Sequence, residues 1–405
     1  MMKSYKISIA QFITLIIIIL CGFRFYGYYN LPSGWDKYPI YIMIPILILY
    51  TSKQIFSKER DIFFRLMRYL LASWILSMFM SYMFWNQPLP LSYTSTSGYL
   101  FFAIFFFFCK KRTPREAIEK IIILFGWIYI ALWLYAMYRA PEVTFGWSDD
   151  QITNMDRGVL RINFTGRISL IFTYFFYLNK CFLSKNPKYK IFAILFFVFI
   201  VLQVTRQLIL WVGVVTVIFI FLKQKKLATI IAILFAFLYL GSVNIHFSSD
   251  SVLGSMINIT NEQMNGELYG GEDPRITEYR YFFNDWSKNI ITDIFGNGIS
   301  HPKTSYGKYE ASLMQKDIYL SDVGYPSMYV IVGALGLILY IVLYIKGTLQ
   351  KLPPELSYVN MFLGFLIPSN IAASWFLNPD TQLATAICIY LIYTYRKRPE
   401  AFHLN

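Results

Sequence analysis

The chain of 405 residues is 56% hydrophobic and 15% charged, with a mean hydropathy of +0.46, which excludes an ordinary soluble globular protein. Its formal net charge is +14, but the basic residues gather beside apolar segments. The charge therefore indicates orientation in a membrane and does not indicate nucleic-acid binding. The composition predicts an all-α integral membrane protein.

Apolar segments recur along the whole chain. A membrane-spanning helix needs about 20 predominantly apolar residues, and twelve segments approach that length. We therefore expect about twelve transmembrane helices, with the first one retained because no pair of small residues marks a signal-peptide cleavage site after it. The expected spans are 7–23, 38–52, 69–85, 97–109, 121–138, 162–179, 191–204, 207–222, 227–243, 324–345, 357–373 and 380–395.

The basic residues predict which side of the membrane each loop faces. With the N-terminus inside, the cytoplasmic segments contain 24 of the 37 basic residues, as the bias of Lys and Arg toward cytoplasmic loops requires. Both termini are then cytoplasmic. The predicted organisation is 1–243 for spans one to nine, 244–322 for one long periplasmic loop, and 323–405 for spans ten to twelve and a cytoplasmic tail.

The long polar loop at 244–322 contains a segment with helical periodicity, from Asp273 to about Ile290. Asp273 is suited to cap this helix and Pro274 to occupy its first turn. Arg275 and Arg280 lie on it, and a Gly296-Asn297-Gly298 turn follows. Apolar residues at steps of three or four predict one apolar face that packs on the membrane or on the spans; they are Ile276, Tyr279, Phe282, Phe283, Trp286 and Ile290.

Arginines at the outer ends of spans form a second group. Arg206 lies in a very short turn between two spans, and Arg157, Arg161 and Arg167 surround the start of the sixth span. An arginine at the membrane boundary is costly without an anionic partner, and its planar fork fits phosphate oxygens. We expect all four, together with Arg275 and Arg280, to bind a pyrophosphate; the competing interpretation is that they extend to lipid headgroups or are solvated.

A third group comprises a histidine and acidic residues in the returning part of the loop. His301, Asp317 and Asp322 are candidates for the base that activates an incoming hydroxyl. The competing interpretations are a solvated histidine and a helix-capping aspartate. The sequence contains no clustered Cys and His pattern and no glycine-rich phosphate loop, so we expect neither a metal nor a cofactor.

The order of these features resembles the superfamily of O-antigen polymerases and O-antigen ligases. The stretch 161–167 is similar to the arginine-bearing span entry of that family, and Val204-Thr205-Arg206-Gln207 resembles its Ser/Thr-Arg turn. Arg275 matches an arginine that leads the loop helix. The motifs Ser321-Asp322-Val323-Gly324-Tyr325 and Gly333-Ala334-Leu335-Gly336 follow in the same order.

The resemblance implies a metal-independent glycosyltransferase of the bacterial inner membrane, with a GT-C-like fold. Its substrate would be an oligosaccharide linked to undecaprenyl pyrophosphate, and its product an O-antigen, as part of lipopolysaccharide, or a capsular or exopolysaccharide. Membrane lipids and a chain-length regulator are the implied partners. Ligases of the family, which transfer glycan to the lipid A core, typically have a histidine and a small polar residue where this chain has Ser321-Asp322, which favours a polymerase.

Two other classes of protein remain as alternatives. A polysaccharide flippase also has about twelve spans, but it would carry charged residues within its spans and keep its loops short. A structural partner of an envelope assembly would tolerate substitution of Arg206 or Arg275 without any change in polymer length.

Overall fold

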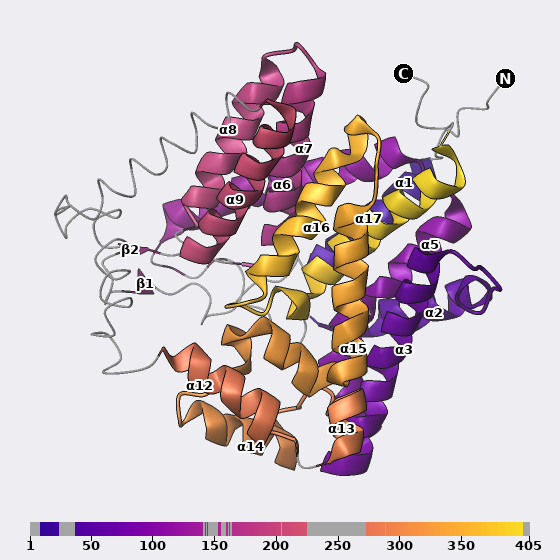
Figure 1. Cartoon of the computed structure of the whole chain (residues 1–405), viewed down its shortest axis with the longest axis vertical. Helices are drawn as coiled ribbons and strands as arrows, with labels where there is room; N and C mark the ends of the chain where they lie inside the picture. Colours follow the sequence, from indigo (N-terminus) through magenta and orange to yellow (C-terminus); the bar gives the residue numbers. More distant parts are fainter. Residues whose placement is uncertain are drawn as a thin grey trace.

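The computed structural model describes residues 9–23, 37–140, 142, 144, 153–154, 159–160, 162, 164–203, 205–224, 273–287 and 289–399, which are helical almost throughout (Figure 1). Within these ranges the strand pairing consists of two-residue strands, β1 (Thr153–Asn154) and β2 (Val159–Leu160), which run antiparallel. The predicted all-α class is confirmed for this part of the chain. The segment 227–243, predicted as a span, lies outside the described residues.

The helices before the long loop are α1 (Ile9–Phe23), α2 (Tyr38–Ile55), α3 (Ile62–Trp85), α4 (Leu89–Thr96), η1 (Ser97–Phe102), α5 (Ala103–Lys111), α6 (Arg115–Arg139), α7 (Arg167–Leu183), α8 (Lys188–Val201) and α9 (Arg206–Lys223). Those within the loop are α12 (Pro274–Arg280), the π-helix η3 (Tyr281–Asp285), α13 (Ile290–Phe295), α14 (Ser305–Met314) and η4 (Leu320–Asp322). The remainder are α15 (Gly324–Leu349), η5 (Pro354–Leu356), α16 (Ser357–Ser369), η6 (Trp375–Leu377) and α17 (Pro379–Lys397).

Five helical segments in the described ranges are long and apolar enough to cross a membrane: Ile62–Trp85, Leu89–Lys111, Arg115–Arg139, Arg206–Lys223 and Gly324–Leu349. The other predicted spans in these ranges also fall on helices, but these are shorter or more polar, as in α8 and α17. The chain is thus a helical protein with helices suited to a membrane, and the count of twelve spans remains a prediction.

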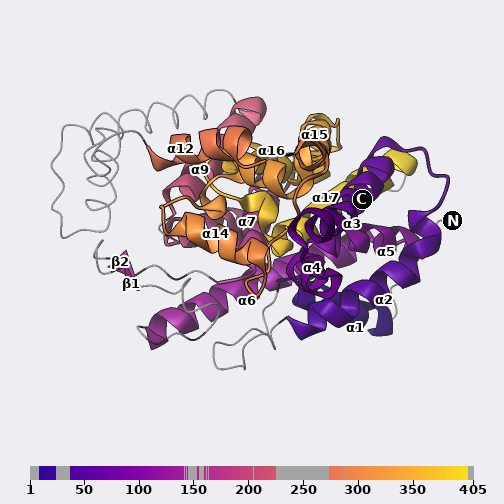
Figure 2. The same cartoon turned by 90° about the horizontal axis from the view of Figure 1, so that it is seen from below.

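Two helices are buried over nearly their whole lengths and form the centre of the bundle. Helix α7 packs between α6, α8 and α16, and α17 packs against α1, α5 and α7. Both helices are therefore enclosed by other helices over most of their surface. Figure 2 shows α1 and α2 toward one edge of the bundle and α12 and α14 toward the other.

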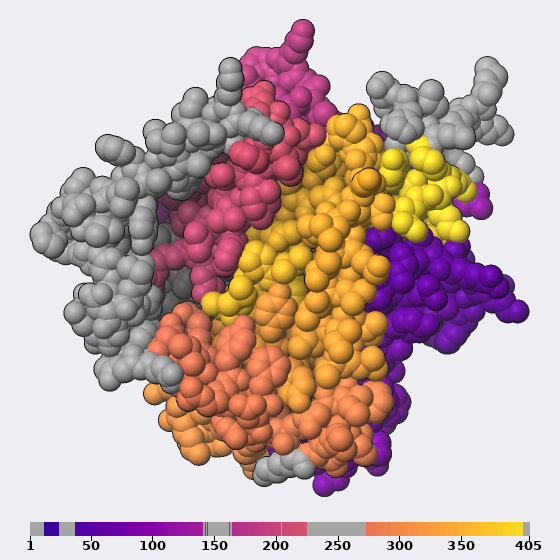
Figure 3. Space-filling model, in the orientation of Figure 1, coloured from indigo at the N-terminus to yellow at the C-terminus, as the bar shows by residue number. Residues whose placement is uncertain are grey.

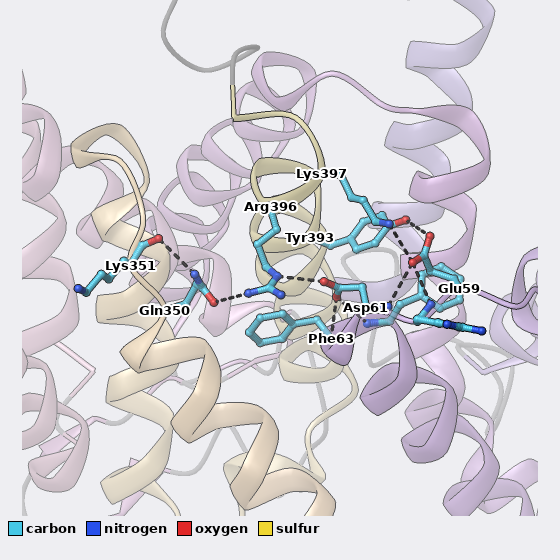
Figure 4. A network of polar contacts seen from close by, with 10 residues as sticks. Glu59, Asp61, Phe63, Gln350, Lys351, Tyr393, Arg396 and Lys397 are labelled. Atoms are coloured by element: carbon cyan, nitrogen blue, oxygen red, sulfur yellow. Dashed lines mark hydrogen bonds and ion pairs between the residues drawn. The ribbon is translucent and has the colours of Figure 1, made fainter.

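Helix α3 connects two ends of the molecule that differ in chemistry. At its first residues an ionic network joins it to α17: Asp61 pairs with Arg396 at 2.9 Å, and Glu59 pairs with Lys397 at 2.9 Å (Figure 4). Arg396 also donates to the Gln350 side-chain oxygen at 3.1 Å. The last residue of α3, Trp85, instead contacts the loop helices through its ring, which stacks on Tyr306. The orientation predicted from basic residues would place the ionic network in the cytoplasm.

The Gly296-Asn297-Gly298 turn is confirmed, and it fills a break in α15. Gly333 has φ 72° and ψ 177°, which interrupts the helix. The N–H groups of Asn297 and Gly298 donate to the carbonyls of Val330 and Ile331, at 2.7 and 2.9 Å. These two carbonyls therefore have backbone partners, as an interrupted helix requires within a bundle.

The side chain of Asn297 should contribute to stability because its amide oxygen and its amide nitrogen each form a hydrogen bond inside the protein. Its Oδ1 accepts from the Trp85 indole at 2.9 Å, and its Nδ2 donates to the Val330 carbonyl at 3.2 Å. Asn297→Ala leaves the indole N–H without this acceptor, so we expect a loss of about 1–3 kcal/mol. Thermal unfolding of the detergent-solubilised protein measures this loss of stability. Gln315→Ala, which removes an exposed amide, is the control, and equal unfolding temperatures for the two variants would contradict the prediction.

The predicted single helix from Asp273 to Ile290 is wrong in its length and in its apolar face. Asp273 does cap α12 by accepting from the Arg275 N–H at 2.9 Å. The helix then widens into the π-helix η3 and ends at Asp285. The wider turn changes the angular spacing of side chains, so the apolar residues divide. Phe282 and Trp286 are buried, whereas Ile276, Phe283 and Ile290 are exposed.

Candidate functional site

The connection between α16 and α17, residues 370–379, is where the loop meets the bundle. The Ser321 carbonyl accepts from the N–H and the hydroxyl of Ser374, at 3.2 and 2.9 Å. The Gly324 N–H donates to the Asn370 carbonyl at 3.1 Å. A Cβ on Gly324 would overlap the carbonyl oxygens of Asn370 and Ala373, so glycine is needed for this approach. In Figure 3 the gold surface of the C-terminal region emerges between α9 and the helices of the loop.

The first residues of α7 lie on the other side of this connection. The Arg167 guanidinium carbon is 4.6 Å from the centroid of the Trp375 ring, a cation–π arrangement. The Asp380 carboxylate accepts from the Gly166 N–H at 3.2 Å and interacts electrostatically with Arg167. The connection thus contacts the start of α7 as well as the end of the loop.

Arg206 begins α9, as Arg167 begins α7, and the two helix starts meet. The Arg167 Nη1 donates to the Thr205 hydroxyl at 3.4 Å, and Thr205 is the residue before Arg206. The short turn predicted between spans seven and eight is confirmed, since α8 ends at Val201. Cations at a helix N-terminus are disfavoured by the helix dipole, by about 0.3–1 kcal/mol each. Arg167 has a compensating anion in Asp380, with which it interacts electrostatically.

The loop contributes Arg275 and Glu278 from α12. Tyr279 of the same helix anchors it, because its hydroxyl donates to the Ile371 carbonyl at 2.6 Å. Arg275 lies 3.7 Å from the Asp273 carboxylate, which is too long for a hydrogen bond. Glu278 is 1% exposed, and its Oε1 accepts from the Tyr319 N–H at 2.9 Å. The 370–379 connection therefore contacts both α7 and α12, which carry the predicted Arg167 and Arg275.

Burial raises the pKa of Glu278 to about 7, and the nearby carboxylates of Asp322 and Asp273 act in the same direction. The Tyr319 N–H and the Arg275 guanidinium oppose this rise. A carboxyl group with a pKa near neutrality is suited to proton transfer. The sequence did not mark Glu278 as a site residue, because a glutamate three residues after Arg275 in a surface helix is ordinarily solvated.

The predicted acids have different surroundings. Asp322 is exposed beside the connection, accepts from the Ser321 hydroxyl at 2.9 Å and lies within electrostatic range of Glu278. It does not cap α15, whose N-cap is Val323. Asp317 is exposed after α14, at φ 58°, and accepts from the Tyr319 hydroxyl at 3.4 Å. Asp322 is thus the predicted acid that the structure brings to Glu278.

His301 belongs to a different cluster, between the loop and α4. Its N–H donates to the Gln87 side-chain oxygen at 2.8 Å, and its Nδ1 accepts from the Lys303 N–H at 3.2 Å. Partial burial, together with Lys303 and Lys37, lowers the pKa of His301. Glu310 of this region accepts from Ser300. These contacts give His301 a role in holding the loop to the bundle.

The remaining predicted arginines are Arg280, Arg157 and Arg161. Arg280 ends α12 and is exposed; five residues from Arg275, it projects from a different side of the helix. Arg157 and Arg161 lie outside the described residues. No group of three or more His, Cys, Asp or Glu side chains in the described ranges is placed to hold a metal ion.

Comparison of the sequence with protein-family models gives no match, and comparison with curated proteins gives none either.

Proposed function

We propose that the protein is a membrane glycosyltransferase that polymerises lipid-linked oligosaccharide repeat units. In this reaction the growing glycan leaves its undecaprenyl pyrophosphate and is joined to the next lipid-linked unit. The site would face the periplasm of a bacterial inner membrane, and the helical bundle would be of the GT-C type with about twelve spans. The observation that carries the proposal is that α7 and α9, whose starts adjoin through the Arg167–Thr205 hydrogen bond, each begin with an arginine.

A pyrophosphate is the ligand that best suits these two helix starts. The partial positive charge of each helix N-terminus adds to the charge of its arginine, and guanidinium groups bind phosphate oxygens in pairs. Asp380 compensates part of the charge near Arg167. Arg275 on α12 would bind the second pyrophosphate of the pair of lipid-linked substrates.

A lipid-linked substrate also needs apolar surface next to its pyrophosphate. Ile371 and Ile276 are 49% and 48% exposed, and Ile371 is tied to α12 through the Tyr279 hydroxyl. Ile371 belongs to the connection, and Ile276 lies on α12 next to Arg275. A soluble nucleotide sugar has no lipid part that would contact this apolar surface, so the surface supports a polyprenyl-linked donor.

Two observations bear on the alternatives. A secondary transporter commonly uses the carbonyls of an unwound helix to coordinate its coupling ion, but the carbonyls at the break in α15 accept from Asn297 and Gly298. A ligase would have a histidine near the start of α15, where this chain has Ser321-Asp322, and His301 lies with Gln87 instead. Both features favour a polymerase.

Incubation of the purified protein with a lipid-linked repeat unit isolated from its own organism tests the proposal. We expect a ladder of products that grow by one repeat unit at a time, separated by gel electrophoresis. A preparation that transfers glycan to lipid A core without forming a ladder would support the ligase instead. Failure to form any product from a matched substrate would overturn the proposal.

A further inference from the structure

We propose that Arg275 Nε and Glu278 Oε2 together bind one hydroxyl group of the acceptor sugar, and that Glu278 takes its proton. The inference rests on the proposed function and adds the residue that activates the acceptor. Both atoms are buried, and neither has a hydrogen-bond partner among the residues that the structure describes. One is a donor and the other an acceptor, and residues three apart lie on the same side of a helix.

A hydroxyl group is the chemical class that matches this pair of atoms. It accepts one hydrogen bond and donates another, so it would satisfy the Arg275 N–H and the Glu278 oxygen at once. A phosphate placed between the Arg275 Nε and the Glu278 Oε2 would be repelled by an ionised Glu278, so a pyrophosphate at Arg275 would bind to the terminal Nη groups instead. A buried polar atom without a partner costs about 1–3 kcal/mol, and a bound hydroxyl would remove that cost for both side chains.

The two side chains of this site differ in how firmly they are held. Glu278 is 1% exposed and fixed by the Tyr319 N–H, 2.9 Å from its Oε1. The Arg275 side chain is 37% exposed, and its ion pair with Asp273 is long, at 3.7 Å. The Glu278 carboxylate is therefore held firmly in place, whereas the Arg275 side chain is held less tightly.

The proposed step is balanced without a metal or a cofactor. The acceptor oxygen forms a bond to the anomeric carbon of the donor glycan, and the bond from that carbon to the phosphate oxygen breaks. The electron pair of the broken bond leaves with undecaprenyl pyrophosphate. The proton of the acceptor hydroxyl moves to Glu278 Oε2, from which it returns to solvent after the product departs.

The charged groups that face Glu278 are Asp322 from η4 and Arg275 and Asp273 from the start of α12. A base must be ionised to accept a proton. Transfer should therefore accelerate as pH rises through about 7, the pKa of Glu278, and reach a plateau above it. Below that pKa the rate should fall about tenfold per pH unit.

Glu278→Gln tests the proposal in the ladder assay. The glutamine side chain keeps an oxygen for the Tyr319 N–H but cannot accept a proton, so we expect a fall in rate of about 10²–10⁴-fold and loss of the rise with pH. Glu310→Gln, which changes another partly buried loop carboxyl, should retain the wild-type rate and pH profile. A Glu278→Gln variant with the wild-type rate and pH profile would overturn the inference but leave the polymerase proposal intact. A wild-type protein that makes no ladder would overturn both.

A stability measurement separates proton transfer from a purely structural role. A carboxyl group whose pKa is raised by folding increasingly destabilises the protein as pH rises from its ordinary pKa, here 4.5, through its folded-state pKa, here about 7. Glu278→Gln should therefore raise the unfolding temperature about one pH unit above the folded-state pKa of Glu278 and leave it unchanged about one unit below the ordinary glutamate pKa. A lower unfolding temperature under both conditions, with the pH dependence of the residual activity retained, would contradict the proposed role.

Discussion

Arg206→Ala is expected to reduce polymer formation by about 10²–10³-fold, the loss typical of removing one group that stabilises charge in a transition state. The departing pyrophosphate gains negative charge as the glycosidic bond breaks, and Arg206 begins α9 where that charge would lie. The ladder assay under single-turnover conditions measures the effect. Arg206→Lys should lie between the alanine variant and the wild type, because a point charge remains but the paired hydrogen bonds of the guanidinium do not.

Arg139→Ala is the matched control for Arg206→Ala. Arg139 ends α6, is about half exposed and forms an ion pair with Glu142. Exposed ion pairs contribute little, so this variant should polymerise at the wild-type rate. If Arg206→Ala and Arg139→Ala retain equal activity while both remain folded, Arg206 does not bind pyrophosphate.

Gly296→Val should prevent folding of the protein around the break in α15. Gly296 has φ 84°, and a Cβ there would overlap the carbonyl group of Ile331. A branched side chain is strained at such a φ, and the overlapping atoms are backbone atoms that cannot rotate away. We expect no monodisperse protein in size-exclusion chromatography after extraction in mild detergent.

A second glycine provides the control for this effect. A Cβ on Gly213, in the middle of α9, would meet no described atom within 4 Å. Gly213→Ala should therefore leave the elution profile unchanged, because alanine is the better helix former by about 1 kcal/mol. A folded Gly296→Val protein with the wild-type unfolding temperature would show that the turn at 296–298 does not determine the shape of α15.

The features that the sequence predicts well depend on local patterns. Apolar segments mark the helices, since a helix in a membrane or a core must be apolar over a long stretch. The Asp273 cap and the turn around Gly296 follow from residue types with strong local preferences. The short turn before Arg206 follows from the spacing of two apolar segments. In each case the information lies within a few neighbouring residues.

The features that the sequence does not predict depend on contacts between distant segments. Glu278 is buried because Tyr319, 41 residues later, supplies an N–H group. The 370–379 connection was predicted partly as the end of a span, but α16 ends at Ser369 and the following residues bind the loop. The π-helix at Tyr281–Asp285 changes the helical period without a local signal, and the predicted apolar face is lost there.

The break in α15 has a consequence for the stability of that helix in a membrane. A helix that enters a membrane with two carbonyls uncovered is unstable there, because no water is present to bind them. The covering groups belong to Asn297 and Gly298, which precede α15 in the chain. In a membrane we therefore expect α15 to be stable in its bent form only together with the turn at 296–298.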